Sequence, residues 1–125
     1  MIFDTDVFIW IQRGSVSAAL IFERHEERFI AVQTYLELMQ GASNMAQLAS
    51  ARRFLKDFNV KIIPLSGEIG SRAMSLVEQY ALSHSMRAGD ALIASTAIES
   101  SQMLCTSNVK HYRQIPLLEI EQLRP

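Results

Sequence analysis

The chain has 125 residues, 49% of them hydrophobic, and its 12 basic and 13 acidic residues leave a formal net charge of −1 at pH 7. This length and apolar content predict one domain over residues 1–125 with a packed core, and the charge balance argues against a simple basic protein that coats DNA. The single cysteine excludes a disulfide framework or a cysteine-based zinc cluster within one chain, and the lack of a long apolar run or a signal-peptide pattern predicts a cytoplasmic protein without a membrane segment.

Apolar periodicity predicts strands that alternate with helices along the chain. This alternation is typical of an α/β fold, and we expect a three-layer α/β/α sandwich around a short, mainly parallel central sheet. In chain order, the expected elements are a strand over 1–3, further apolar residues over 7–11, a helix from an N-cap at Ser15 to about 27, a strand over 29–32, a helix from Thr34 to about Gly41, a helix over 44–58, a strand over 60–65, a helix over 67–83, a helix that starts at Asp90, a strand over 103–106 and a short strand over 117–120.

Four oxygen-bearing side chains lie where a parallel sheet forms its sites. Asp4 ends the first strand, and Asn108 lies just past the strand over 103–106. Glu37 and Asp90 each lie in the first turn of an expected helix. Because sites in open parallel sheets form beyond the carboxyl ends of the strands, these side chains have reason to meet at one rim. Carboxylates that meet there repel one another unless a cation is bound, and an all-oxygen set favours Mg²⁺ or Mn²⁺ over zinc.

Most of these residues also have a purely structural explanation. Thr34 and Glu37 fit a capping box, in which the glutamate satisfies a backbone N–H. Asp90 fits the negative charge that a helix N-terminus favours, Asp6 fits a cap of the following turn, and Asn108 is a common turn residue. Only the acid that ends the first, buried strand lacks such an explanation.

Four segments in the right order resemble the PIN-domain family, and most closely its branch of VapC-type toxins. They are DTDVFIW near the start, TYLELMQGA in the middle, and AGDALIASTAIE followed by MLCTSNVKHY near the end. The resemblance covers nearly the whole chain. It implies a PIN-like fold and a metal-dependent endoribonuclease that uses Mg²⁺ or Mn²⁺, as the toxin of a type II toxin–antitoxin pair.

The resemblance also implies roles for individual residues. Asp4, Glu37 and Asp90 match the acids that are catalytic and bind the metal in this family. Asp6 falls where the family often carries a small polar residue or an acid beside the site, and Thr106 matches a threonine that commonly braces it. Both are therefore expected to support the site.

Two positions depart from the family pattern. Asn108 stands where many PIN domains carry a fourth aspartate, and His111 replaces an acid that often precedes the aromatic residue. Asn108 still offers a carbonyl oxygen to a metal, but it does not neutralise charge, so we expect a second ion to bind weakly. The departure leaves an alternative open, in which the chain is a catalytically impaired PIN-like module that binds RNA or a protein partner.

The expected partners are an RNA substrate, a cognate antitoxin and a second copy of the chain. Arg87, Lys110 and Arg113 are the candidates for holding the RNA backbone, since they lie close in sequence to the expected rim. Family analogy predicts a homodimer and an apolar groove that takes an antitoxin peptide. The candidates for that groove are Phe8, Trp10, Ile11 and the helix over 45–58.

Two other phosphoryl-transfer classes fit less well. A haloacid-dehalogenase-type phosphatase also opens on an Asp-x-Asp pattern, but it requires Thr or Val where Phe8 stands. A response-regulator receiver requires an aspartate at the end of its third strand, where this chain has Ser66.

Overall fold

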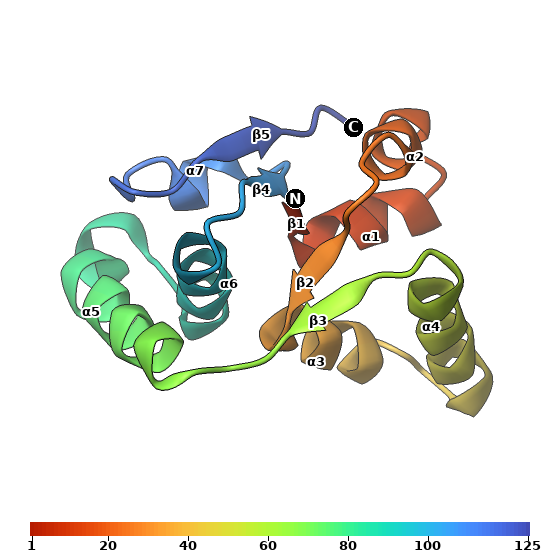
Figure 1. The fold of residues 1–125 in the computed structure, drawn as a ribbon, viewed down its shortest axis with the longest axis horizontal. Helices are drawn as coiled ribbons and strands as arrows, with labels where there is room; N and C mark the ends of the chain where they lie inside the picture. The colour runs from red at the N-terminus through yellow and green to blue at the C-terminus, as the bar shows by residue number, and fades with distance from the viewer.

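A five-stranded parallel sheet with strand order β3-β2-β1-β4-β5 forms the centre of the protein. The structure, a computed structural model, describes all of residues 1–125. Helices lie on both sides of the sheet (Figure 1). The elements are β1 Ile2–Phe3, α1 Thr5–Gln12, α2 Val16–Glu23, β2 Phe29–Ala31, α3 Val32–Gln40, α4 Met45–Asp57, β3 Lys61–Ile63, α5 Gly67–His84, α6 Ala88–Glu99, β4 Leu104–Thr106, α7 Val109–Tyr112 and β5 Ile120–Gln122.

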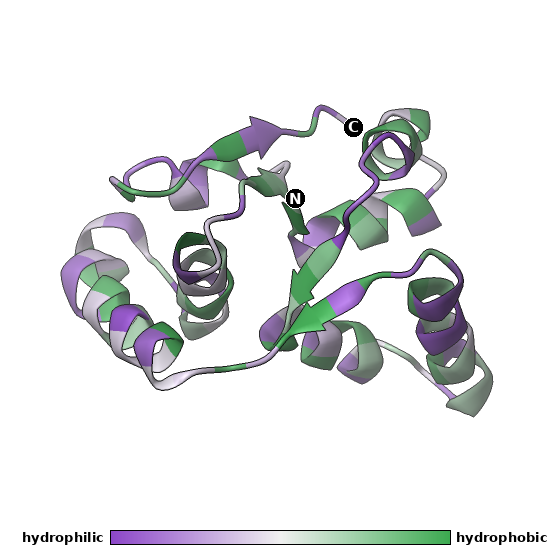
Figure 2. Cartoon of the chain, in the orientation of Figure 1, coloured by the Kyte–Doolittle hydropathy of each residue, from purple (hydrophilic) through white to green (hydrophobic).

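Alternate residues of the short central strands are buried in two different cores. Successive side chains of a strand point to opposite faces of the sheet, so residues that are neighbours in the sequence belong to different cores. One core packs β1, β2 and β4 against α5 and α6, and the other packs the same strands against α1, α2 and α4. The strand residues of the first core are Ile2, Ala31 and Leu104, and those of the second are Phe3, Ile30 and Cys105. Figure 2 accordingly colours β2 as hydrophobic, whereas α4 carries strongly hydrophilic turns.

This architecture confirms the expected α/β sandwich, while several boundaries differ from the sequence prediction. Residues 5–12 form a helix that the periodicity did not assign, and Asp4 is its N-cap. The helix capped by Ser15 ends at Glu23 rather than near 27, and the last strand starts at Ile120 rather than 117. No helix is both long and apolar enough to cross a membrane.

The prediction that Thr34 caps a helix is wrong. Strand β2 runs directly into α3, which starts at Val32 after an N-cap residue, Ala31, whose side chain makes no capping hydrogen bond. Thr34 is instead fully buried within the helix and accepts a hydrogen bond of 3.2 Å from the hydroxyl of Thr5. The capping box with Glu37 is therefore absent, and the Glu37 carboxylate is available for other contacts.

Candidate functional site

The candidate site lies at the point where the order of strand addition reverses. From the central strand β1, the sheet grows through β2 and β3 on one side and through β4 and β5 on the other. Ligand sites in open α/β sheets form at such a switch point, beyond the carboxyl ends of the strands. Here these ends carry Asp4, which follows β1, and Thr106, which ends β4.

Asp4 is buried and held by hydrogen bonds to both of its oxygens. Its Oδ1 accepts from the backbone N–H of Thr5 at 2.8 Å, so the carboxylate caps α1. Its Oδ2 accepts from the hydroxyl of Thr106 at 2.7 Å. This hydrogen bond joins the ends of two adjacent strands and orients the carboxylate.

Asp6 ties the first turn of α1 to the loop that follows β4. Its Oδ2 accepts from the backbone N–H of Ser107 at 2.9 Å and from the hydroxyl of the same serine. Thr106 donates to the same oxygen over a longer distance of 3.5 Å. The other oxygen, Oδ1, is buried without any hydrogen-bond partner. Asp6 thus positions the loop and leaves one free acceptor atom.

Asp90 lies in the first turn of α6 and contacts two side chains of α7. Its Oδ1 accepts from the hydroxyl of the buried Tyr112 at 3.3 Å. Its Oδ2 lies 3.5 Å from Nδ1 of His111. The short helix α7 therefore fixes the position of this acid.

Glu37 lies next to the start of α6 but bonds to its own helix. Its Oε1 accepts from the side-chain amide of Gln33 at 3.1 Å, one turn earlier on α3. A Cβ atom added at Gly89 would lie 3.3 Å from the same oxygen. Glu37 is thus close to Gly89, the residue before Asp90. Glycine allows this approach because it has no side chain.

Burial and mutual repulsion raise the pKa of Asp4 from 3.8 to about 7. Burial is the largest cause, followed by the negative charge of Asp6, with a smaller contribution from Asp90. The hydrogen bonds from Thr106 and Thr5 oppose this rise. Burial and the same acids also raise the pKa of Tyr112, which keeps its hydroxyl protonated and able to donate. Neither Asp4 nor Asp6 forms an ion pair.

The structure does not bring three histidine, cysteine, aspartate or glutamate side chains close enough to form a complete ligand group for a metal ion. Asp4, Asp6 and Asp90 share one electrostatic neighbourhood, while Glu37 bonds to Gln33 beside it. Like-charge repulsion disfavours closer packing of these carboxylates when no cation is bound. The carboxylate oxygens, the buried free Oδ1 of Asp6 and the raised pKa of Asp4 all fit a divalent cation.

The other candidates lie on or next to α6 and α7, with Arg87 as the N-cap of α6, Lys110 within α7 and Arg113 just after it. Asn108 precedes α7, and its backbone N–H donates to the Thr106 hydroxyl at 3.0 Å, but its side chain makes no capping bond. Arg87, Lys110 and Arg113 are exposed, and none of them forms an ion pair. They are free to contact a polyanion.

Sequence reasoning missed four residues of this site. Gln33 and Ser107 hold Glu37 and Asp6, Tyr112 holds Asp90, and Gly89 leaves room for Glu37. For Tyr112 a signal existed, since it is the aromatic residue after His111 at the end of the segment MLCTSNVKHY. The other three contacts join residues whose local patterns are ordinary.

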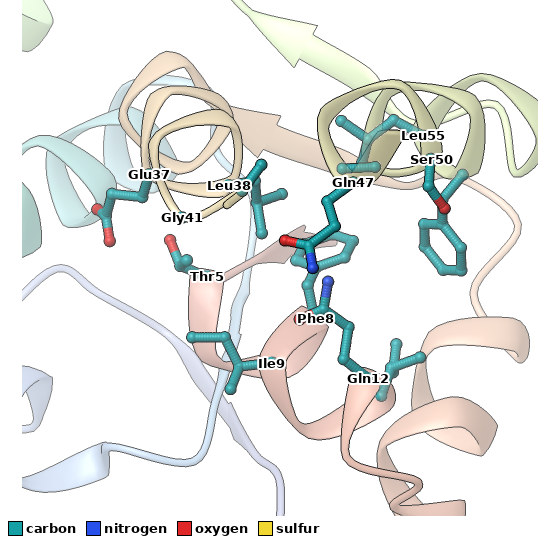
Figure 3. A pocket seen from close by; sticks show the side chains of 14 residues that line it. Thr5, Phe8, Ile9, Gln12, Glu37, Leu38, Gly41, Gln47, Ser50 and Leu55 are labelled. Atoms are coloured by element: carbon teal, nitrogen blue, oxygen red, sulfur yellow. The ribbon is translucent and has the colours of Figure 1, made fainter. Parts of the chain in front are cut away.

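An apolar groove of about 650 Å³ opens between α1, α3 and α4 and reaches the site at Thr5 and Glu37. Figure 3 shows Phe8 and Leu55 lining it, with Gln12 and Gln47 on facing helices. Of the residues expected in a groove, the lining set includes Phe8, Ile11 and the α4 residues Gln47, Ser50, Ala51, Phe54 and Leu55, whereas Trp10 is not part of it.

Comparisons with known proteins agree with this fold. A family model described as the PIN domain matches residues 1–115. A toxin–antitoxin complex from Klebsiella pneumoniae contains a similar chain, 28% identical with a TM-score of 0.78, and the match covers 94% of this chain and 93% of that one. VapBC2 from Rickettsia felis, solved bound to a DNA fragment from its promoter, contains another, 26% identical with a TM-score of 0.82, covering 99% and 100%.

A third match, in DNA-bound VapBC from Salmonella typhimurium, is 18% identical with a TM-score of 0.79, and it covers 97% of this chain and 96% of that one. At this identity the match concerns the fold alone. No curated protein matches the chain in sequence.

Proposed function

Because the chain belongs to the PIN-domain family, as its motifs suggested, we propose that it is a metal-dependent endoribonuclease and the toxin of a type II toxin–antitoxin pair. The observation that carries the proposal is the buried Asp4 at the switch point of the sheet, within the electrostatic reach of Asp6 and Asp90 and without a basic partner. A buried acid beside other acids is costly unless a cation is bound. The similar chains in toxin–antitoxin complexes support the toxin assignment.

We assign Asp4 and Asp90 as the main metal-holding acids, with Glu37 as the third and the carbonyl oxygen of Asn108 as a further candidate. The bound Mg²⁺ or Mn²⁺ would lower the pKa of an attacking water and stabilise the charge that develops on the phosphate. Thr106 keeps the Asp4 carboxylate oriented toward the rim, and Tyr112 does the same for Asp90. Gln33 engages only Oε1 of Glu37, so Oε2 is the oxygen that this residue would contribute.

RNA is proposed as the substrate, with its backbone held at the exposed edge of the acidic group. Arg87, Lys110 and Arg113 would supply the positive charge, and each is exposed and unpaired. Single-stranded loops suit a shallow rim because their bases are unstacked and accessible. The proposal places the protein in the cytoplasm, where such RNA occurs.

Cleavage of a structured RNA pool tests the proposal. The purified protein should cut RNA with Mg²⁺ or Mn²⁺ and fail to cut with EDTA, and Asp4→Asn and Asp90→Asn should lose the cuts. Asp57→Asn, at an exposed acid at the end of α4, is the matched control and should keep them. Metal-independent cuts would contradict the metal mechanism, and RNA binding without cleavage in any metal would favour the impaired module.

The antitoxin is proposed to occupy the groove between α1, α3 and α4. The groove is mainly apolar and adjoins Glu37, so a peptide bound in it would lie beside the acidic group. Substitution of Ala51, on the groove wall, by Trp should block that peptide while the free protein still cleaves RNA. Co-purification with the product of a neighbouring gene measures the effect, and undiminished capture by the variant would contradict the location.

A homodimer is also proposed, and light scattering of the purified protein tests it.

A further inference from the structure

His111 brings an imidazole nitrogen to the edge of the acidic group. It lies on α7, and its Nδ1 is 3.5 Å from Oδ2 of Asp90. The other oxygen of Asp90 is engaged by Tyr112. About half of the His111 side chain is exposed, so its ring is free to adjust, and no other side chain holds its Nδ1. His111 and Asp90 therefore present a nitrogen and an oxygen donor side by side.

The two atoms are too far apart for a strong hydrogen bond. Nitrogen–oxygen hydrogen bonds have optimal lengths of about 2.7–3.2 Å, whereas Nδ1 and Oδ2 are 3.5 Å apart. Both atoms therefore remain available to a shared partner.

We propose that His111 is a nitrogen ligand of the divalent ion and makes this site select first-row transition-metal ions over Mg²⁺. The proposal rests on the metal site of the proposed function. Imidazole binds such ions with an affinity that rises from Mn²⁺ through Co²⁺ to Ni²⁺, whereas Mg²⁺ prefers oxygen ligands and gives up its water reluctantly. Asn108 strengthens the argument, because this neutral residue at the same edge adds no charge that would favour Mg²⁺.

A simple electrostatic contact between His111 and Asp90 makes a different prediction. If the ring only contributed charge or packing near Asp90, its removal would change the affinity for every divalent ion by a similar factor. A ligand that donates an electron pair affects the affinity for Co²⁺ far more than that for Mg²⁺. The ratio of the two affinities therefore separates the two explanations.

Calorimetric titration of the RNA-free, full-length protein with Co²⁺ and with Mg²⁺ tests the proposal. His111→Ala should weaken Co²⁺ binding about tenfold or more, with a much smaller effect on Mg²⁺. His111→Asp, which replaces nitrogen by oxygen, should tighten Mg²⁺ binding and lower the preference for Co²⁺. The visible absorption of bound Co²⁺ should shift in both variants. Equal changes for both ions, or an unchanged ratio, would overturn the proposal.

Two controls separate this proposal from the proposed function. His84→Ala removes an exposed histidine at the end of α5, whose ring contacts Ser83, and it should leave both affinities unchanged. Asp90→Asn should weaken binding of both ions. If it does so while His111→Ala leaves the ratio intact, the metal site stands and His111 is not a ligand. If the unchanged protein binds neither ion, both proposals fail.

Discussion

The hydroxyl of Thr106 donates a hydrogen bond of 2.7 Å to Oδ2 of Asp4, and the two residues lie 102 positions apart in the chain. This bond connects the ends of β1 and β4 at the switch point of the sheet. The same threonine oxygen also accepts the backbone N–H of Asn108 at 3.0 Å. One buried hydroxyl thus links the central acid to the loop that leads into α7.

Replacing Thr106 with valine should destabilise the protein and reduce cleavage. The substitution keeps the shape of the side chain but leaves an oxygen of Asp4 and the N–H of Asn108 without their partner. Each buried group that loses its partner costs about 1–3 kcal/mol. Urea denaturation measures the loss. Thr106→Ser keeps the hydroxyl and should retain most of the stability, and a valine variant as stable as the original protein would contradict the role assigned to this bond.

The stability of the metal-free protein should fall as the pH rises from about 4 to about 7. The pKa of Asp4 is raised from 3.8 to about 7 in the folded state, so in this range the folded chain keeps a proton that the unfolded chain releases. The unfolded state then binds fewer protons, and the free energy of unfolding decreases with pH, by at most about 1.4 kcal/mol per pH unit for one group.

The control for this pH dependence is Asp4→Asn, which removes the titrating group and should flatten the curve. Urea denaturation at several pH values, with EDTA present, measures the effect for both proteins. Adding Mg²⁺ or Mn²⁺ at pH 8 should restore stability to the original protein, since a cation that binds only the folded state stabilises it. A parallel decline in both proteins would show that Asp4 is not the cause.

Gly89→Ala should impair cleavage while leaving the protein folded. The added methyl group would lie 3.1 Å from the amide nitrogen of Gln33 and 3.3 Å from Oε1 of Glu37, so both side chains must move. Alanine favours a helix over glycine by up to about 1 kcal/mol, which offsets the crowding. Gly70→Ala in α5 is the matched control, because its methyl group would meet no atom within 4 Å. Equal cleavage by the two variants would argue against a role for Glu37 at this position.

Arg28→Lys should lower the free energy of unfolding by about 1.5–3 kcal/mol without a direct effect on the site. The guanidinium donates to the carbonyl oxygens of Phe22, Glu23 and Phe58, at 2.9, 3.0 and 2.8 Å. It also lies over the rings of the two phenylalanines. Lysine does not reproduce this planar, three-way geometry. Thermal unfolding measures the loss of stability. Arg53→Lys, at an exposed position of α4, serves as the control. Equal stability of the two variants would contradict the prediction.

Much of the fold was predictable because its signals are local. The buried strand around Ile30, the N-cap at Ser15 and the position of Asp90 in the first turn of a helix follow from residues that are neighbours in the sequence. The helix that starts at Thr5 was missed because its apolar residues run without interruption over 7–11 and so show no helical period. The start of α3 was misplaced because Thr34 has the pattern of a cap but is buried against Thr5.

The alternation of strands and helices, the acids that follow them and the family of the chain could all be inferred from residue types at short spacings. The position of β4 beside β1, the contacts of Tyr112 and His111 with Asp90, and the hydrogen bond between Gln33 and Glu37 became visible only in the folded chain. A periodic pattern specifies which face of an element is buried but not which element covers it. Strand order and side-chain partners are selected by packing of the whole chain.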